Sequence, residues 1–242
     1  MPDLVSPLSV PSRFCGPTTS GNGGWTAGAL AAYLVPGPVR VTLRKPPPLD
    51  TPLTVSLDGG AAIASQDGVT VGEAVLVDAD PVPVEPVDAA TARAAEATYA
   101  GLRSHAFPSC FACGPGRDVG DGLRIFPGRV AKDSHDLARV AATWTPDPSL
   151  GTDVVSLPVA WAALDCVGGW AGDLEDRMMV LGMMTAHVLA LPVIGEEHVV
   201  VGMARRSEGR RTWTASTLYA PDGRVLGTAE HVWVAVDPSA FR

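Results

Sequence analysis

The sequence predicts an α+β protein in which a buried helix and a curved antiparallel sheet form a unit that the chain builds twice. Three observations predict this fold. Two segments are apolar around their whole helical circumference, at Gly24–Leu34 and Val159–Ala171. Each precedes several segments that alternate apolar and polar residues, which is typical of strands with one buried face. An Asp-Gly turn comes before the last strand of each series, at 67–68 and 222–223.

Composition and charge exclude several classes of protein. Of the 242 residues 46% are hydrophobic, which is too many for a disordered chain. The net charge of −8 disfavours a nucleic-acid partner, because phosphates are neutralised by Lys and Arg. Four cysteines are too few for a disulfide framework. The first ten residues lack a targeting pattern and no apolar run could span a bilayer, so we expect a cytoplasmic protein without a membrane partner.

The first unit is expected to cover residues 1–78. Its helix, Gly24–Leu34, is rich in Ala and Gly, so a sheet can pack closely around it. Strands are predicted at Val39–Leu43, Leu53–Leu57 and Val69–Val77, where apolar and polar residues alternate.

A connector is expected at residues 79–101, because this stretch is first rich in Pro and then, over Ala89–Tyr99, rich in Ala and helical in character. The second unit would then cover residues 102–242. Besides the helix at Val159–Ala171 it is predicted to contain strands at Leu123–Phe126, Ala138–Trp144, Met179–Leu191, His198–Ala204, Arg211–Tyr219 and Val225–Val236.

The motifs and their order resemble the acyl-CoA thioesterase-like proteins of the hotdog fold, in which a curved antiparallel sheet wraps one long helix. Residues 39–55 (VRVTLRKPPPLDTPLTV) resemble the strand–Pro–strand passage of that family. The run Asn22-Gly23-Gly24-Trp25 resembles its helix start, and Leu164-Asp165 resembles the acid that it carries within a helix. The resemblance covers most of 20–78 and 138–236. It implies a double hotdog, with two copies of a long buried helix wrapped by a curved antiparallel sheet.

Asp165 is the most informative single residue. It is the only charged residue between Val155 and Asp173, within an otherwise apolar helix. Burying a carboxylate costs on the order of several kcal/mol unless partners offset the loss of water. The family resemblance implies that this acid activates water toward a thioester carbonyl or attacks the carbonyl directly. The alternative is a structural carboxylate that caps the backbone or pairs with an arginine.

Asn22, Gly23 and Gly24 begin the first predicted helix. Free N–H groups and the helix dipole favour negative charge there, and glycine permits close approach of a ligand. The three residues therefore suit stabilisation of an oxyanion, although Asn22 could equally be a simple N-cap. The resemblance implies that Asp165 works with Gly23 and Gly24 of the other unit. Because the first helix contains no acid or histidine, we expect one working site per chain and one degenerate site.

Metal ligation is a weaker prediction. His105, Cys110 and Cys113 offer three zinc ligands, but a single paired-cysteine motif is only half of a structural site. The candidates for a fourth ligand are Cys15, Cys166 and His135. We expect no metal and a packed thiol pair instead. Cys166 lies in an apolar helix, where thiols are usually inert.

Candidate substrate contacts come from one basic hairpin and two tryptophans. The basic residues could hold the phosphates of coenzyme A or could form a solvated turn; they are Arg205, Arg206, Arg210 and Arg211. Trp25 and Trp161 are expected to border an apolar acyl pocket.

These observations together predict a thioesterase-like hydrolase of an acyl-CoA or related thioester. Such an enzyme needs water and no cofactor, and the chain could pair into a homodimer. The alternative is a non-catalytic acyl-CoA- or lipid-binding protein on the same fold, because fold does not determine function. A hotdog hydratase is disfavoured, since Trp170 stands five residues after Asp165, where the hydratase pattern has His.

Overall fold

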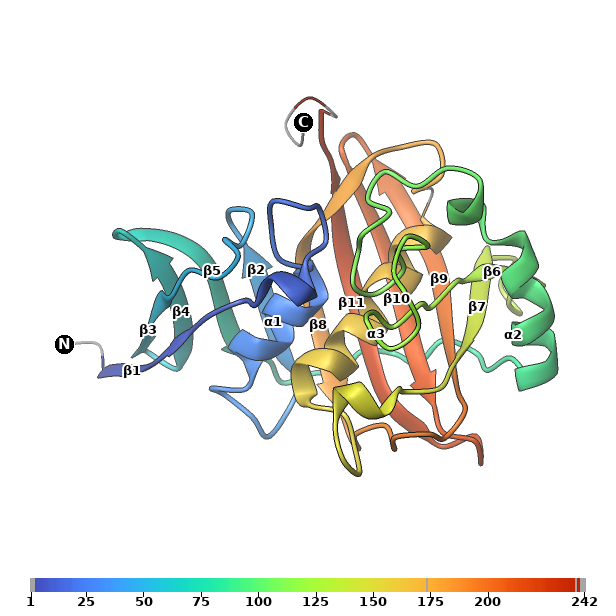
Figure 1. Cartoon of the computed structure of the whole chain (residues 1–242), viewed down its shortest axis with the longest axis horizontal. Coiled ribbons are helices and arrows are strands. Elements are labelled where there is room, and N and C mark those ends of the chain that lie inside the picture. The colour runs from blue at the N-terminus through green and yellow to red at the C-terminus, as the bar shows by residue number, and fades with distance from the viewer. Residues whose placement is uncertain (1–2, 173, 238, 240–242) are drawn as a thin grey trace.

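A computed structural model describes residues 3–172, 174–237 and 239, and it places two helices, α1 and α3, against one face of an antiparallel sheet (Figure 1). The helices are α1 (Gly23–Ala31), α2 (Ala89–Ala95) and α3 (Leu157–Ala171). Within the described residues the sheet has eleven strands in the order β1-β3-β4-β5-β2-β8-β11-β10-β9-β7-β6. The strands are β1 (Asp3–Leu8), β2 (Val39–Leu43), β3 (Leu53–Asp58), β4 (Ala61–Gln66), β5 (Val69–Leu76), β6 (Gly128–Val130), β7 (Arg139–Trp144), β8 (Met179–Val188), β9 (His198–Glu208), β10 (Arg211–Tyr219) and β11 (Val225–Ala235).

The strands of the N-terminal half lie together on one side of the sheet, and those of the C-terminal half lie on the other. The halves join where β2 pairs with β8, with Val41 opposite Met184. Helix α1 packs against β2 and β5, whereas α3 packs against β9, β10 and β11. The order of the strands along the sheet therefore follows the division of the sequence into two halves.

Two glycines of α1 allow the helices to pack closely. A Cβ atom on Gly24 would lie 2.4 Å from Cβ of Asp165, and one on Gly28 would lie 2.7 Å from Cβ of Trp161. Neither distance leaves room for a side chain. The glycines thus set the close approach of α1 and α3, which brings residues 141 positions apart into contact.

Most of the predicted elements are confirmed, and one strand prediction is wrong. Leu123–Phe126 is not a strand, because Arg124 has a left-handed backbone with φ of 53°. The amides of Leu123 and Ile125 donate instead to carbonyls of an irregular loop, those of Phe111 and Ala112. The second half therefore begins its sheet at β6. Strands β1, β4 and β6 were not predicted, and α1 ends at Ala31, three residues earlier than expected.

The connector covers the face of the sheet that is turned away from α3. Its extended part is anchored at Val84, whose amide donates to Thr217 Oγ1 over 2.9 Å and whose carbonyl accepts from the hydroxyl of Tyr219. Asp88 then caps α2 by accepting from the amide of Thr91 over 2.8 Å. Ala92 of α2 belongs to a second, smaller hydrophobic core on this face.

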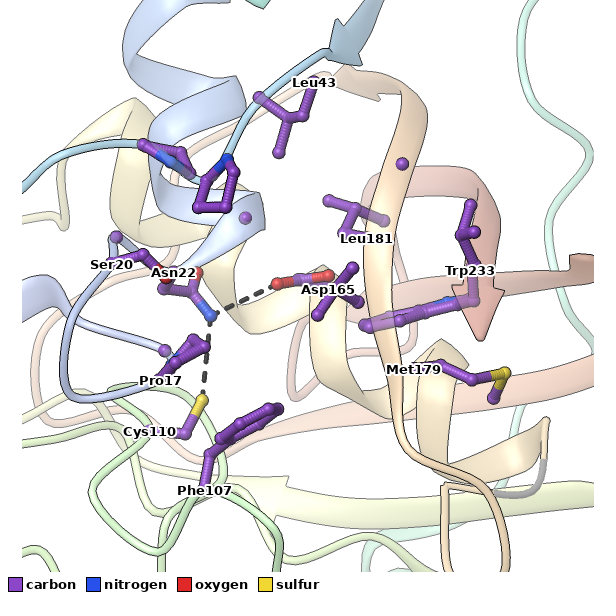
Figure 2. Close-up of a pocket in the computed structure, with 18 of the residues that line it drawn as sticks. Pro17, Ser20, Asn22, Leu43, Phe107, Cys110, Asp165, Met179, Leu181 and Trp233 are labelled. Atoms are coloured by element: carbon purple, nitrogen blue, oxygen red, sulfur yellow. Dashed lines mark hydrogen bonds between the residues drawn. The ribbon is translucent and has the colours of Figure 1, made fainter. Parts of the chain in front are cut away.

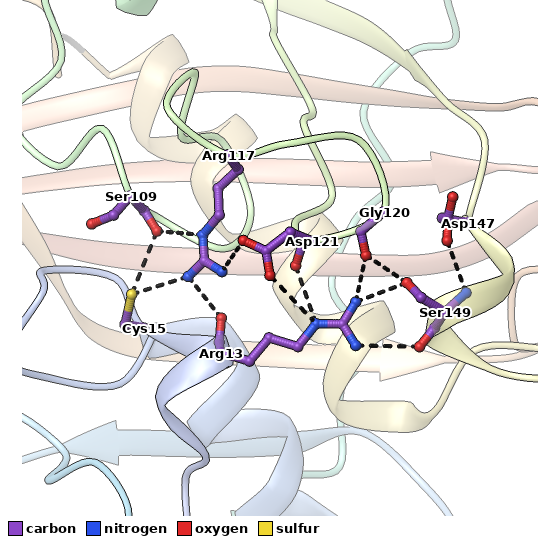
Figure 3. Close-up of polar contacts among 8 residues, drawn as sticks. All are labelled: Arg13, Cys15, Ser109, Arg117, Gly120, Asp121, Asp147 and Ser149. Atoms are coloured by element: carbon purple, nitrogen blue, oxygen red, sulfur yellow. Dashed lines mark hydrogen bonds and ion pairs between the residues drawn. The ribbon is translucent and has the colours of Figure 1, made fainter.

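Residues 105–126, called the Cys segment below, are bound to the chain just before α1 (Figure 3). Arg117 is only 9% exposed and donates to the carbonyls of Ser109 and Arg13, each over 2.7 Å. Its guanidinium also pairs with Asp121 over 2.8 Å. Arg13 in turn donates to the carbonyl of Gly120 over 2.7 Å. These bonds fasten the Cys segment beside the start of α1.

No helix among the described residues is both long and apolar enough to cross a membrane.

Candidate active site

Asp165 of α3 meets the start of α1, as Figure 2 shows. The side chain is 1% exposed. Its Oδ2 accepts a hydrogen bond from the Gly24 amide over 2.9 Å and another from Asn22 Nδ2 over 3.2 Å. Its Oδ1 is buried without a hydrogen-bond partner among the described residues. One carboxylate oxygen is thus held by the other half of the chain, and the second is left for a ligand or a water molecule.

Each residue at the start of α1 has a defined task. Asn22 is the N-cap, and its Oδ1 accepts from the amide of Trp25 over 2.8 Å, which turns its Nδ2 toward Asp165. The Gly24 amide is engaged by Asp165, so it is not available to a substrate oxygen while that bond holds. Gly23 is the first residue of the helix, and such an amide has no partner within its helix. Gly23 also lines the cavity described next.

A cavity of about 270 Å³ opens above the Asp165 carboxylate. It lies between the end of β2 and the beginning of β8, and its walls are mostly apolar (Figure 2). The apolar lining includes Leu43, Phe107, Met179, Leu181 and Trp233. Its polar lining includes Asn22, Asp165, Cys110 and Cys166. An apolar cavity with a few convergent polar groups is the usual form of a small-molecule site.

Burial raises the pKa of Asp165 to about 7. The hydrogen bond from the Gly24 amide lowers the pKa, the nearby Cys110 sulfur raises it, and the bond from Asn22 lowers it. Loss of hydration is therefore the largest influence on this carboxyl, as expected for an acid inside an apolar helix.

Two basic residues that sequence reasoning missed line this cavity, namely Arg44 and Lys45. Arg44 lies 3.4 Å from a carboxylate oxygen of Glu73, and Lys45 forms no ion pair within the described part of the chain. They directly follow β2 and precede a run of three prolines. Their position at a strand end was the only feature of the sequence that could have indicated a role in binding. Many solvated residues share that position.

The four arginines predicted as substrate contacts lie in the hairpin of β9 and β10, two in β9, one in the turn and one at the start of β10, and they do not line the cavity. Arg205 pairs with Glu230 over 3.1 Å, and the Arg206 guanidinium lies 3.9 Å from the ring centroid of Trp213. Arg210 donates to the carbonyl of Ala235, and Arg211 is exposed. Their positive charges are thus partly satisfied within the protein.

The two predicted tryptophans also lie away from the cavity lining. Trp25 stacks on Phe14 with ring centroids 4.4 Å apart. Trp161 packs against Gly28 and lines a different hollow, at the far end of α1. Both side chains are buried and contribute to the core.

The Cys segment brings two of its cysteines to α3. The sulfur atoms of Cys110, Cys113 and Cys166 all lie within 4.8 Å of one another. His105 Nε2 lies 3.3 Å from Cys113 Sγ. Hydrogen bonds from the thiols of Cys113 and Cys166 lower the pKa of Cys110, whereas burial raises the pKa of Cys113. The predicted group of His105, Cys110 and Cys113 therefore meets Cys166.

The other two candidates for a fourth ligand lie elsewhere. Cys15 accepts a hydrogen bond from Arg117 over 3.1 Å, and it donates to the carbonyl of Ser109 (Figure 3). His135 lies in an exposed turn. Neither belongs to the cysteine group.

The overall architecture is similar to solved structures along almost the whole chain. A protein with a hot dog fold from Alicyclobacillus acidocaldarius superposes with a TM-score of 0.61 at 14% identity, covering 98% of this chain and 96% of that one. The acyl-CoA thioesterase II TesB2 of Mycobacterium marinum gives 0.60 at 13% identity, covering 98% and 97%. The tesB protein of Mycobacterium avium subs paratuberculosis gives 0.59 at 14%, covering 92% and 90%. The chain therefore has the hotdog fold.

The likeness is one of structure, since sequence identities of this size identify a fold and not an activity. No protein-family model matches the sequence, and no curated protein matches it either.

Proposed function

We propose that this protein hydrolyses an acyl thioester, with Asp165 as the group that activates water. The observation that carries the proposal is the unpartnered Oδ1 of Asp165, buried at the wall of an apolar cavity. A buried carboxylate oxygen without a partner is unfavourable for stability, so its retention suits a role in binding or chemistry.

The architecture behind this proposal is a double hotdog. We infer one unit at residues 1–78, a connector at 79–101 and a second unit at 102–242. The separation of the strands into two contiguous groups, joined by β2 and β8, supports this division. So does the pairing of one helix with each group. The residues of the candidate site then come from both units, since Asn22 and Gly24 belong to the first and Asp165 to the second.

The proposed reaction uses the two oxygens of Asp165 differently. Oδ2 stays bound to Gly24 and Asn22, which orients the carboxylate. Oδ1 accepts a proton from a water molecule, whose oxygen forms a bond to the thioester carbonyl carbon. The carbonyl oxygen becomes negative near the Gly23 amide at the positive end of α1. The C–S bond then breaks, and the departing thiolate takes the proton from Asp165, leaving a carboxylic acid and a thiol.

An acyl conjugate of coenzyme A is the proposed substrate. The names of the TesB structures support this choice. The apolar walls of the cavity suit an acyl chain, and the basic side chains of Arg44 and Lys45 suit phosphate groups. The two residues replace the arginine hairpin as the proposed phosphate contacts.

The decisive experiment is release of free thiol from a panel of acyl-CoAs by the wild type and by Asp165→Asn. The variant is expected to lose about 10²- to 10⁴-fold in turnover, the range of a general base. Asp80→Asn is the matched control, because Asp80 is an exposed carboxylate that pairs with His187 over 2.7 Å, at the opposite end of β8 from the cavity. It is expected to retain turnover.

Two results would count against this function. Retained turnover in folded Asp165→Asn would remove Asp165 from the reaction. Tight binding of an acyl-CoA by the wild type without any thiol release would favour the non-catalytic lipid-binding alternative. An acyl adduct on Asp165 in rapidly quenched enzyme, detected by mass spectrometry, would indicate direct attack by the carboxylate in place of activated water.

A further inference from the structure

Three thiols form a compact buried group that the proposed hydrolysis does not use. Cys110, Cys113 and Cys166 are 4%, 3% and 7% exposed, and all are free thiols. The sulfurs of Cys110 and Cys166 are 3.7 Å apart. Around a tetrahedral zinc ion with Zn–S bonds of about 2.3 Å, two sulfurs are about 3.8 Å apart. One edge of the group therefore has the length that a zinc site requires, and the other two sulfur–sulfur distances are no longer than 4.8 Å.

The loop that carries two of these cysteines has the form of a metal-binding turn. Cys110 and Cys113 are separated by two residues, and the Gly114 amide donates to the Cys110 carbonyl over 2.9 Å. A Cβ atom on Gly114 would lie 2.4 Å from the carbonyl oxygen of Pro108, so only glycine fits there. The turn thus presents both sulfurs to the same side.

One side chain lies within donor distance of two of the sulfurs. Asn22 Nδ2 lies 3.7 Å from Cys110 Sγ (Figure 2) and 3.9 Å from Cys166 Sγ, within reach of an N–H donor to each. Such donors commonly surround metal-bound thiolates and tune them.

A nitrogen ligand lies beside the third sulfur. His105 Nε2 is 3.3 Å from Cys113 Sγ, close to the sulfur–nitrogen edge of about 3.6 Å in a tetrahedral zinc site, but it does not lie within 4.8 Å of all three sulfurs, so the ring would have to turn toward the ion. Its Nδ1 accepts the amide proton of Phe107 over 3.0 Å. Ligation through Nε2 would place the imidazole proton on Nδ1, so the ring would give up that bond when the metal binds.

We propose that Cys110, Cys113 and Cys166 bind one zinc ion as thiolates, with His105 Nε2 as the fourth ligand. Thiolate-rich tetrahedral sets with one imidazole are typical of structural zinc. The ion joins the Cys segment to α3 at the residue next to Asp165, and so fixes one wall of the cavity. This site does not depend on the proposed hydrolysis.

The first test is the zinc content of the reduced wild-type protein, purified without chelators and measured by elemental mass spectrometry. One zinc per chain is expected. Cys113→Ser is expected to bind zinc at least about tenfold more weakly, because a thiolate ligand is lost. Cys15→Ser is the matched control: Cys15 is also a buried thiol, but it lies outside the group. It is expected to keep the ion.

The second test replaces zinc with cobalt, whose absorption reports its ligands. Wild-type protein stripped of zinc and titrated with Co²⁺ is expected to develop thiolate-to-cobalt charge-transfer absorption with a one-to-one endpoint. His105→Ala is expected to weaken cobalt binding by about 10- to 100-fold, and unchanged affinity would remove His105 from the ligand set.

Reduced wild-type protein that contains no zinc and develops no cobalt–thiolate absorption would overturn the site. So would a folded Cys113→Ser variant with undiminished zinc. The cobalt titration of the wild type needs no variant, so it decides the question even if the cysteine variants do not fold. Asp165→Asn is expected to keep its zinc while losing hydrolysis, and this separates failure of the metal site from failure of the proposed function.

Discussion

Helices α1 and α3 touch at two points. Both contacts are close, but the side chains that meet there differ in polarity. At one crossing Gly24 of α1 lies against Asp165 of α3, and at the other Gly28 lies against Trp161. Both crossings use a glycine because neither leaves room for a side chain. The first joins a carboxylate to a helix start, whereas the second joins an indole to a glycine within a helix. Close packing is thus shared, and the polar groups are present at one crossing only.

The equivalent positions of α1 and α3 explain this difference. Asp165 lies nine residues after its N-cap, Ser156, and Ala31 lies nine residues after Asn22. The acid of one helix therefore corresponds to an alanine of the other. Pro158 corresponds to Gly24, each being the second residue after the N-cap.

The opposite end of the helix pair also has a hollow, but it lacks the acid and the hydrogen-bond donors. Pro158 has no N–H to donate, and Ser156 makes no side-chain cap bond. A hollow of about 420 Å³, lined by Leu157 and Trp161, nevertheless lies there. The comparison teaches that one pair of packed helices can have a hollow at each end while only one of the two collects the donors and the acid. It agrees with our expectation of one working site per chain, which stays a prediction.

The strongest way to challenge the comparison is to place an acid at the alanine position. Ala31 is fully buried, and no backbone amide of Pro158 can hold an introduced carboxylate. Ala31→Asp is expected to lower the free energy of unfolding by about 3–5 kcal/mol, as for an unpaired buried charge, and to add no hydrolysis. Urea denaturation measures the loss. Ala32→Asp is the control, because Ala32 is exposed and should change stability by less than about 1 kcal/mol. Equal losses would show that burial is not the cause.

The two helix glycines offer a paired test of packing against chemistry. Gly24→Ala and Gly28→Ala are each expected to cost about 1–3 kcal/mol of stability, since either methyl group overlaps α3. Only Gly24→Ala should also reduce turnover per folded molecule, because it displaces Asp165. Thermal unfolding and thiol release, measured on the same preparations, separate the two effects. An equal loss of turnover in Gly28→Ala would contradict a site confined to one crossing.

The smallest effect is expected at the mouth of the cavity. Lys45→Ala should raise KM for an acyl-CoA by up to about fivefold, the worth of one exposed ion pair, with little change in kcat. Arg211→Ala should leave KM unchanged, because Arg211 does not line the cavity. Steady-state kinetics at low ionic strength give the comparison, since salt weakens such pairs. The reverse ranking would restore the arginine hairpin as the phosphate contact.

Much of the fold was predictable because its signals are local. The alternation in β10 and the Asp-Gly turn at 67–68, with its positive φ angles, both follow from short stretches of sequence. Asp165 was recognisable for the same reason, as a lone charge in an apolar helix. The failure at Leu123–Phe126 has a tertiary cause: its amides bond to a loop and not to a neighbouring strand.

The missed parts of the site depend on contacts between distant residues. Cys166 lies 56 residues from Cys110 in the sequence, so neither motif indicates the other. In the sequence, Lys45 looks like an ordinary solvated residue at the end of a strand. Only the tertiary structure, in which β2 pairs with β8, places it at the cavity.

The sequence by itself determined most of the helices and strands, two of the turns between them, and which single carboxylate an apolar helix must accommodate. These follow from periodicity, turn chemistry and the cost of burying charge, all of which act over a few residues. Only the tertiary structure decided that Asn22 and Gly24 hold Asp165, that three cysteines share one site, and which basic residues reach the cavity. Those outcomes depend on the close approach of α1 and α3 and on the pairing of β2 with β8, which no local pattern encodes.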